Sequence, residues 1–101
     1  MSSLQVPDIG EDMVGPVIRE GALADAVIDA VTDDNPGQEV HIFERGDYVR
    51  IHTDRSCRLT RASIERHLGR SFDLAMLEAE MPSFKGRMES STDELRWFYS
   101  D

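Results

Sequence analysis

Four side chains in this sequence are of the types that perform acid–base or nucleophilic chemistry near neutral pH. They are the three histidines, His41, His52 and His67, and a single cysteine, Cys57. No two histidines have the HxxxH or HExxH spacing of a zinc site, and the Glu-x-x-His pair of di-iron bundles is absent from the sequence. We therefore expect each histidine to be a surface or half-buried side chain rather than a metal ligand.

Cys57 would act as a nucleophile only beside a poised base. It stands in a strand-like run between Arg55 and Arg58, and a cysteine packed inside a strand is the simpler interpretation. A small enzyme that uses His41, His52 or Cys57 stays open as a hypothesis. One cysteine cannot form a disulfide within the chain, which fits a reducing compartment.

Acidic side chains form a regular pattern in the first half of the chain. Asp25, Asp29 and Asp33 recur every four residues and would share one face of a helix. Carboxylates on one straight helix rarely wrap a hard cation, so a solvated face or a contact surface is favoured. Asp33 and Asp34 would end that helix, where negative charge costs about 0.3–1 kcal/mol each at an exposed site. This local conflict makes the acidic end a candidate contact surface.

The net charge of −9 is unevenly distributed along the 101 residues. Residues 1–40 carry nine acids and one base, whereas the remainder is close to neutral. Nucleic acid and anionic membrane repel such a chain, and a partner with a basic patch suits it. The sequence has no long apolar run and no pattern of a signal peptide, so we expect a cytoplasmic protein.

Residues 14–37 organise the predicted fold. They read as a short strand, a turn at Glu20-Gly21 and an amphipathic helix whose apolar face repeats every three to four residues. Asn35-Pro36-Gly37 ends the helix, because proline cannot continue it.

The rest of the chain alternates between strand and helix patterns. We expect strands over residues 39–45, 47–53 and 57–60, helices over 61–68 and 74–80, and strands over 83–89 and 94–100. The first three of these strands would form an antiparallel meander. The prediction is an α+β fold, with an antiparallel sheet and helices on one face. Residues 1–12 would be a flexible tail, and residues 13–101 a single domain.

Several motifs in this order resemble one known family. They are VGPVIR at residues 14–19, DNPG at 34–37, DYVRI at 47–51, LTRASIERHLGRSF at 59–72 and FKGRM at 84–88. Together they resemble the effector proteins, also called coupling or regulatory proteins, of soluble di-iron multicomponent monooxygenases. The similarity is greatest to the toluene, aromatic or alkene monooxygenase branch, and it covers roughly residues 13–100.

The resemblance implies a protein without metal, organic cofactor or catalytic residues of its own. Such effectors dock on the large subunit of a di-iron hydroxylase, remodel its active site, and couple the use of electrons and O2 to hydrocarbon hydroxylation or epoxidation. A Rieske-type ferredoxin is expected to compete for an overlapping surface, and the free effector is expected to be a monomer. The implied fold has two βαββ-like halves and resembles the ferredoxin-like class.

The resemblance also places a hydroxylase interface on particular residues. The segment after the second helix maps onto Pro82, Ser83, Phe84 and Gly86, with Phe84 as an anchor or as a core residue. Asn35, Pro36 and Gly37 are a second candidate group, and Asp25, Asp29 and Asp33 are a third. An alternative function is a small-molecule-binding regulatory domain of ferredoxin-like type.

Overall fold

The first half of the chain is a βαββ unit. The computed structural model describes residues 12–100, so the predicted flexible tail lies outside the described residues apart from Asp12. The elements are β1 (Met13–Arg19), α1 (Ala22–Asp34), β2 (His41–Arg45) and β3 (Tyr48–Asp54). In space β1 pairs antiparallel with β3, and β3 pairs antiparallel with β2.

The second half repeats this pairing pattern. Its elements are β4 (Ser56–Thr60), α2 (Arg61–Leu68), α3 (Leu74–Ala79), β5 (Ser83–Lys85), β6 (Arg87–Ser90) and β7 (Glu94–Phe98). The first strand, β4, pairs with the last, β7, which pairs in turn with β6. The α+β class and the two βαββ-like halves are therefore confirmed.

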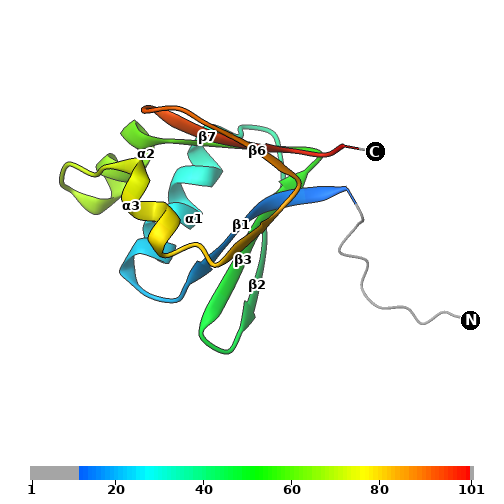
Figure 1. The fold of residues 1–101 in the computed structure, drawn as a ribbon, viewed down its shortest axis with the longest axis horizontal. Coiled ribbons are helices and arrows are strands. Elements are labelled where there is room, and N and C mark those ends of the chain that lie inside the picture. Colours follow the sequence, from blue (N-terminus) through cyan, green and yellow to red (C-terminus); the bar gives the residue numbers. More distant parts are fainter. Residues whose placement is uncertain (1–11, 101) are drawn as a thin grey trace, which may run out of the picture.

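The expectation of a single sheet and of a three-strand meander is wrong. Within residues 12–100 the strands form two sheets, ordered β2-β3-β1-β5 and β4-β7-β6 (Figure 1). Only Arg55 separates β3 from β4, and it has a positive φ of 65°. One residue is too short for a hairpin loop, so β4 leaves the first sheet at this corner. The similarity to the ferredoxin-like class thus holds for each βαββ unit and not for a continuous sheet.

A second correction concerns the strand predicted over residues 83–89. The structure breaks it at Gly86 into β5, which joins the first sheet, and β6, which joins the second. Gly86 has a φ of 101°, and a Cβ there would lie 2.7 Å from Cγ1 of Val14. Glycine is therefore required where the chain crosses from one sheet to the other.

The helix ends follow the sequence signals. The hydroxyl of Thr60 caps α2 by accepting the N–H of Ser63, and Gly69 ends this helix in the left-handed conformation. Asp73 caps α3 by accepting the N–H of Ala75. The predicted helices over residues 61–68 and 74–80 are therefore confirmed to within one residue. Each helix in the described part of the chain is too short or too polar to cross a bilayer.

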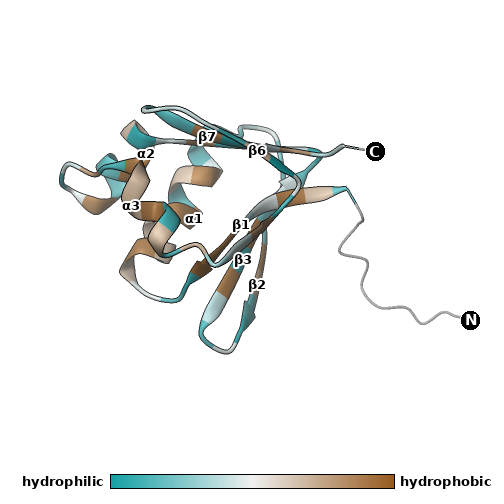
Figure 2. Cartoon of the chain, viewed as in Figure 1, coloured by the Kyte–Doolittle hydropathy of each residue, from teal (hydrophilic) through white to brown (hydrophobic). Residues whose placement is uncertain are grey.

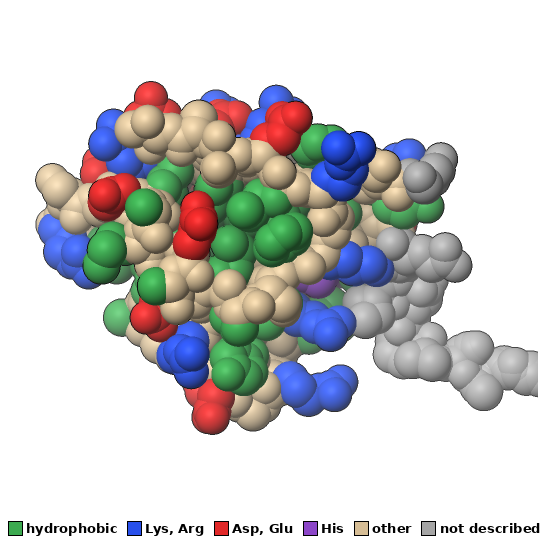
Figure 3. Space-filling view, in the orientation of Figure 1, with side chains coloured by type: hydrophobic (Ala, Val, Ile, Leu, Met, Phe, Trp, Pro, Cys, Tyr) green, Lys and Arg blue, Asp and Glu red, His purple; other side chains and the backbone are tan. Residues whose placement is uncertain are grey.

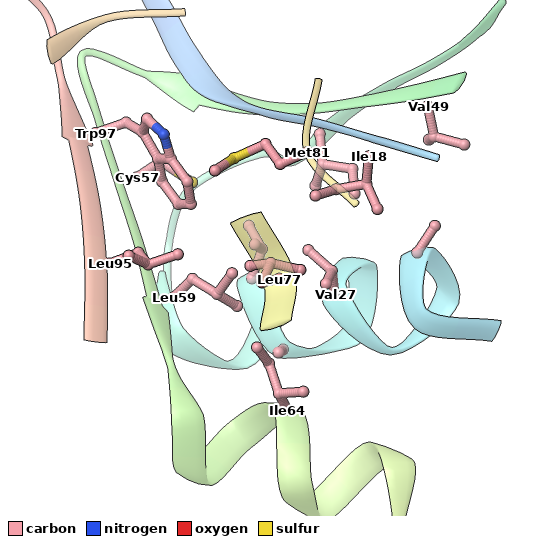
Figure 4. Packing of buried hydrophobic residues seen from close by; sticks show 14 of the residues in the cluster. Ile18, Val27, Val49, Cys57, Leu59, Ile64, Leu77, Met81, Leu95 and Trp97 are labelled. Atoms are coloured by element: carbon pink, nitrogen blue, oxygen red, sulfur yellow. The ribbon is translucent and has the colours of Figure 1, made fainter. Parts of the chain in front are cut away.

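One apolar core lies between the two sheets and the helices. Hydrophobic residues, brown in Figure 2, lie along α1 and the strands, and the buried ones among them form a single cluster. Trp97 on β7, Cys57 on β4 and Met81 lie close together, and Val27 and Leu77 fill the centre (Figure 4). Burying each large apolar side chain stabilises the fold by about 1.5–3 kcal/mol. Both halves therefore depend on the same core.

Gly15 allows the first sheet to close, which gives a test of this packing. A Cβ on Gly15 would lie 2.2 Å from the carbonyl oxygen of Ile51, at a φ of 145°. We expect Gly15→Ala to lower the free energy of unfolding by about 3 kcal/mol or more, measured by urea denaturation. Gly46→Ala is the control, because Gly46 also has a positive φ but no atom stands in the way of a Cβ. It should cost about 1 kcal/mol, and equal losses would contradict the account.

Candidate docking surface

An exposed segment crosses from one sheet to the other at residues 82–87, and every residue in it is exposed. Phe84 is 42% exposed, which is unusual for a large aromatic side chain in a strand. Its partner in β1 is Pro16, which has no N–H to donate. In an antiparallel ladder, pairs that exchange backbone hydrogen bonds alternate with pairs that do not, and a proline cannot belong to the first kind. The backbone N–H and C=O of Phe84 therefore point to the free edge of the sheet. The segment thus presents both an apolar ring and unpaired backbone groups.

The predicted residues Pro82, Ser83, Phe84 and Gly86 all lie on this segment, which we call the edge segment. Sequence reasoning overlooked Lys85 and Arg87, although the FKGRM motif contains both. A hollow of about 290 Å³ adjoins the segment where the two sheets approach each other. It is lined by Val14, Lys85, Gly86, Arg87, Tyr99 and Ser100.

The second candidate group, at the end of α1, is divided between the interior and the surface. Asn35 is only 7% exposed, and its amide donates to the carbonyl oxygens of Val31 and Arg58, both at 2.8 Å. Its side-chain oxygen accepts the N–H of Arg58 at 3.0 Å. Pro36 and Gly37 are exposed. The side chain of Asn35 therefore holds β4 in place, and the other two residues face solvent.

The predicted conflict of two carboxylates at the end of α1 is resolved by α2. Asp34 accepts the N–H of Thr60 at 2.7 Å and the hydroxyl of Ser63 at 2.6 Å. Its charge therefore lies at the N-terminus of α2, where the helix dipole favours an anion. Asp34 is a link between the halves rather than part of an exposed acidic end.

The third candidate group, the acidic face of α1, is partly engaged within the molecule. Asp33 binds the ring of His67 at 2.6 Å and the guanidinium of Arg66 at 3.1 Å. These hydrogen bonds lower the pKa of the Asp33 carboxyl. Asp29 lies 3.8 Å from the other ring nitrogen of His67, and Asp25 is exposed. The three aspartates thus share a face, and within residues 12–100 Asp29 and Asp33 form ion pairs with α2 whereas Asp25 does not.

The histidines and the cysteine are not gathered into one site. His41 and His52 are paired across β2 and β3, whereas Cys57 lies in the other sheet. Burial raises the pKa of the Cys57 thiol to about 12, which keeps it protonated. In the described range, no three His, Cys, Asp or Glu side chains are arranged as ligands of a metal ion.

The expectation of a surface or half-buried His52 is wrong, because only 2% of it is exposed. Gly15 lies opposite it on β1, and a Cβ there would be 3.1 Å from Cδ2 of the ring. The missing side chain of Gly15 therefore leaves room for the imidazole to lie over the strand. Burial, and then the positive charges of Arg50 and Lys85, lower the pKa of His52 to about 4.

Comparison with known proteins places the chain in a family. The sequence profile of the MmoB/DmpM family matches residues 12–98, which is most of the chain. The chain belongs to this family. A curated relative, the effector subunit of the alkene monooxygenase system of Xanthobacter autotrophicus (strain ATCC BAA-1158 / Py2), is 73% identical over 99 residues, which cover 98% of each chain.

Solved structures with low sequence identity share the fold of this member of the MmoB/DmpM family. A chain of a phenol hydroxylase–regulatory protein complex superposes with a TM-score of 0.75 at 20% identity, covering 87% of this chain and 99% of that one. The regulatory protein B of soluble methane monooxygenase gives a TM-score of 0.66 at 18% identity, covering 96% of this chain and 71% of its own. The family match and the 73% identical relative confirm the predicted resemblance to monooxygenase effector proteins, and these structures confirm the fold.

The buried imidazole of His52 gives a pH-dependent test of the packing around Gly15. Its folded pKa of about 4 lies below the ordinary value of 6.5, so between these values the unfolded chain binds more protons. We expect stability to fall as the pH drops from about 6.5 towards 4, by up to tenfold in the folded-to-unfolded ratio per pH unit. Above pH 6.5 this contribution is constant.

The measurement is urea denaturation of the wild type and of His52→Gln between pH 5 and 7. The variant should show a flatter dependence on pH in this window. His67→Gln, at an exposed histidine of α2, is the matched control and should not flatten it. Parallel pH profiles for the wild type and His52→Gln would contradict a buried neutral imidazole.

Proposed function

We propose that this protein is the effector subunit of an alkene monooxygenase system, and that it binds and regulates the hydroxylase component without catalysing a reaction itself. The observation that carries the proposal is the 73% identity, over 98% of both chains, with the effector subunit of such a system. The exposed edge segment, with Phe84 at its centre, offers a surface of the kind that protein partners recognise.

The family resemblance extends the proposal to the partner. The hydroxylase would hold the di-iron centre on its large subunit, and the effector would remodel that active site on docking. We further propose that a Rieske-type ferredoxin competes for an overlapping hydroxylase surface. The free effector would be a monomer, and the whole system would work in the cytoplasm.

An effector of this kind acts through differential affinity. If the hydroxylase exists in two states, a bound protein shifts the balance only by as much as it binds one state more tightly. Coupling energies of this type are commonly 1–3 kcal/mol, or about 5–150-fold in population. Shape and charge at the interface are sufficient for this, and no reactive side chain is required.

The edge segment is the proposed centre of the interface. Pro82, Ser83, Phe84 and Gly86 are exposed together, and an aromatic ring at such a position can anchor a complex. The end of α1, with Pro36 and Gly37, and the aspartates of its acidic face stay proposals as further contacts. For Asn35 such a contact would have to use the backbone, because its amide is bound inside the protein.

Reconstitution tests the proposed function. The hydroxylase, its electron-transfer components and an alkene are incubated with a reduced nicotinamide electron donor, with and without this protein. We expect epoxide formed per donor consumed to rise when the protein is added, and the protein alone to form no epoxide. A ratio that does not change with the protein would contradict the proposal.

Phe84→Ala tests the anchor. We expect hydroxylase binding to weaken by about 2 kcal/mol or more, as for a buried aromatic contact, measured by isothermal titration calorimetry. The melting temperature should change little, because the ring is 42% exposed.

Ile42→Ala is the matched control for Phe84→Ala. Ile42 lies in the same row and on the same side of the sheet, at its opposite edge, and is 43% exposed. Its truncation should leave hydroxylase binding within about 0.5 kcal/mol of the wild type. If Phe84→Ala lowers the melting temperature strongly and leaves the affinity for the hydroxylase nearly unchanged, Phe84 is a core residue instead.

A further inference from the structure

The side of the first sheet that faces away from α1 carries a concentration of basic residues. Strand pairing places Met13 and Asp54 at the border of this side and three rows of residues within it, which we call the outer face. They contain Arg45, Tyr48 and Arg19, then Phe43, Arg50, Val17 and Ser83, then His41, His52, Gly15 and Lys85. In Figure 3, Lys and Arg side chains gather on the right of the view, beside β2 and β3, where Figure 1 shows no helix.

Two independent observations place these charges on one side. The guanidinium of Arg19 lies 5.5 Å from the ring centroid of Tyr48. Arg50 and Lys85, from strands on either side of β1, both lower the pKa of His52 through their charge. The outer face therefore carries a positive potential, although the whole chain has a net charge of −9.

Arg19 and His41 of the outer face each have a carboxylate close by. Glu80 pairs with Arg19 at 3.4 Å, and Asp54 lies 3.5 Å from His41. Among residues 12–100, no carboxylate is in ion-pair distance of Arg45 or Arg50. The aspartates of α1 are directed elsewhere, since Asp29 and Asp33 contact α2. The outer face therefore carries more basic than acidic side chains, whereas Arg58, Arg61 and Arg66 elsewhere on the molecule lie beside carboxylates.

We infer that the outer face is part of the surface that docks on the hydroxylase, and that the hydroxylase surface covering it is acidic. The inference rests on the proposed function and adds the chemistry of the partner. Continuity supports it, because Phe84 of the edge segment and Lys85 of the outer face are neighbours on a strand of three residues.

A protein interface that includes Lys85 is large enough to include other residues of the outer face. Adjacent strands lie about 4.8 Å apart, so Arg50 on β3 is about 10 Å from the edge strand β5. A standard interface covers about 800 Å² per partner. A patch of that area is wider across than the distance from β5 to Arg50. Ser83 and Lys85, on either side of Phe84, belong to the outer face, so a partner that wraps around this edge strand would also reach Arg50. Arginine and tyrosine, which the outer face presents at Arg50 and Tyr48, are also the types enriched in interfaces.

A protein partner fits this face better than the other anionic surfaces. A membrane or a nucleic acid presents negative charge over an extended area and would be repelled by the rest of the chain, whose net charge is −9 as a whole. A folded protein can present acidic side chains at the outer face alone. An acidic protein patch is therefore the occupant that the charge distribution favours.

Charge reversal at Arg50 is the direct test. The association rate of the full chain with the hydroxylase is measured by stopped flow at about 20 mM and about 500 mM salt. We expect Arg50→Glu to slow association on the order of tenfold at low salt and less than about twofold at high salt, because salt screens the attraction. Arg50→Lys, which keeps the charge, should stay close to the wild type.

Arg96→Glu is the matched control, since it changes the net charge equally at an exposed side chain of β7, in the other sheet. It should slow association much less than Arg50→Glu. If the two reversals have equal effects while the wild type still binds, the inference is overturned and the proposed function stands. If the wild type does not bind the hydroxylase, the proposed function itself fails.

A sedimentation assay addresses the membrane alternative. Vesicles of phosphatidylglycerol should not carry down the wild-type protein at about 100 mM salt. Sedimentation of the wild type that is lost in Arg50→Glu would assign the outer face to a membrane and overturn the inference.

Discussion

The structure depends on a junction of polar side chains at the end of α1. Asp34 accepts hydrogen bonds from the first turn of α2, and Asn35 binds both backbone groups of Arg58 in β4. Hydrogen bonds to a buried or partly buried charged group are worth about 1.5–3 kcal/mol, and leaving one partner unpaired costs a similar amount. The two βαββ halves have separate sheets, so this junction and the shared core hold them in one orientation.

That orientation determines which surfaces are available to a partner. The junction engages the charged end of α1, and the helices cover one side of the first sheet, leaving the edge segment and the arginines of the outer face exposed. A protein that regulates a larger enzyme through binding energy alone needs such surfaces to keep a fixed shape, because a surface that must order on binding loses part of that energy. Gly15 and Gly86 contribute to this shape by allowing close approach of strands.

Local signals in the sequence predicted the elements well, and long-range pairing is where prediction failed. Thr60, Gly69 and Asp73 act at helix ends through neighbouring backbone groups, so their roles were readable from spacing. The division into two sheets depends on the single residue Arg55 between two strands, and its consequence appears only when β7 pairs with β4. The sequence likewise predicted a surface or half-buried His52 but could not show that Gly15, far away in sequence, would make room for its burial.

The candidate surface was predictable to a similar extent. Phe84 was identified from a family motif, and whether it was exposed or buried required the structure. The basic outer face had no linear signature, because its charges come from four strands.

Backbone amide hydrogen exchange of the full chain, with and without the hydroxylase, tests the account most directly. We predict slower exchange at residues 83–87 in the complex, with no comparable change at Thr60 and Ser63 in the junction. Unchanged exchange at residues 83–87 under saturating hydroxylase would contradict the account.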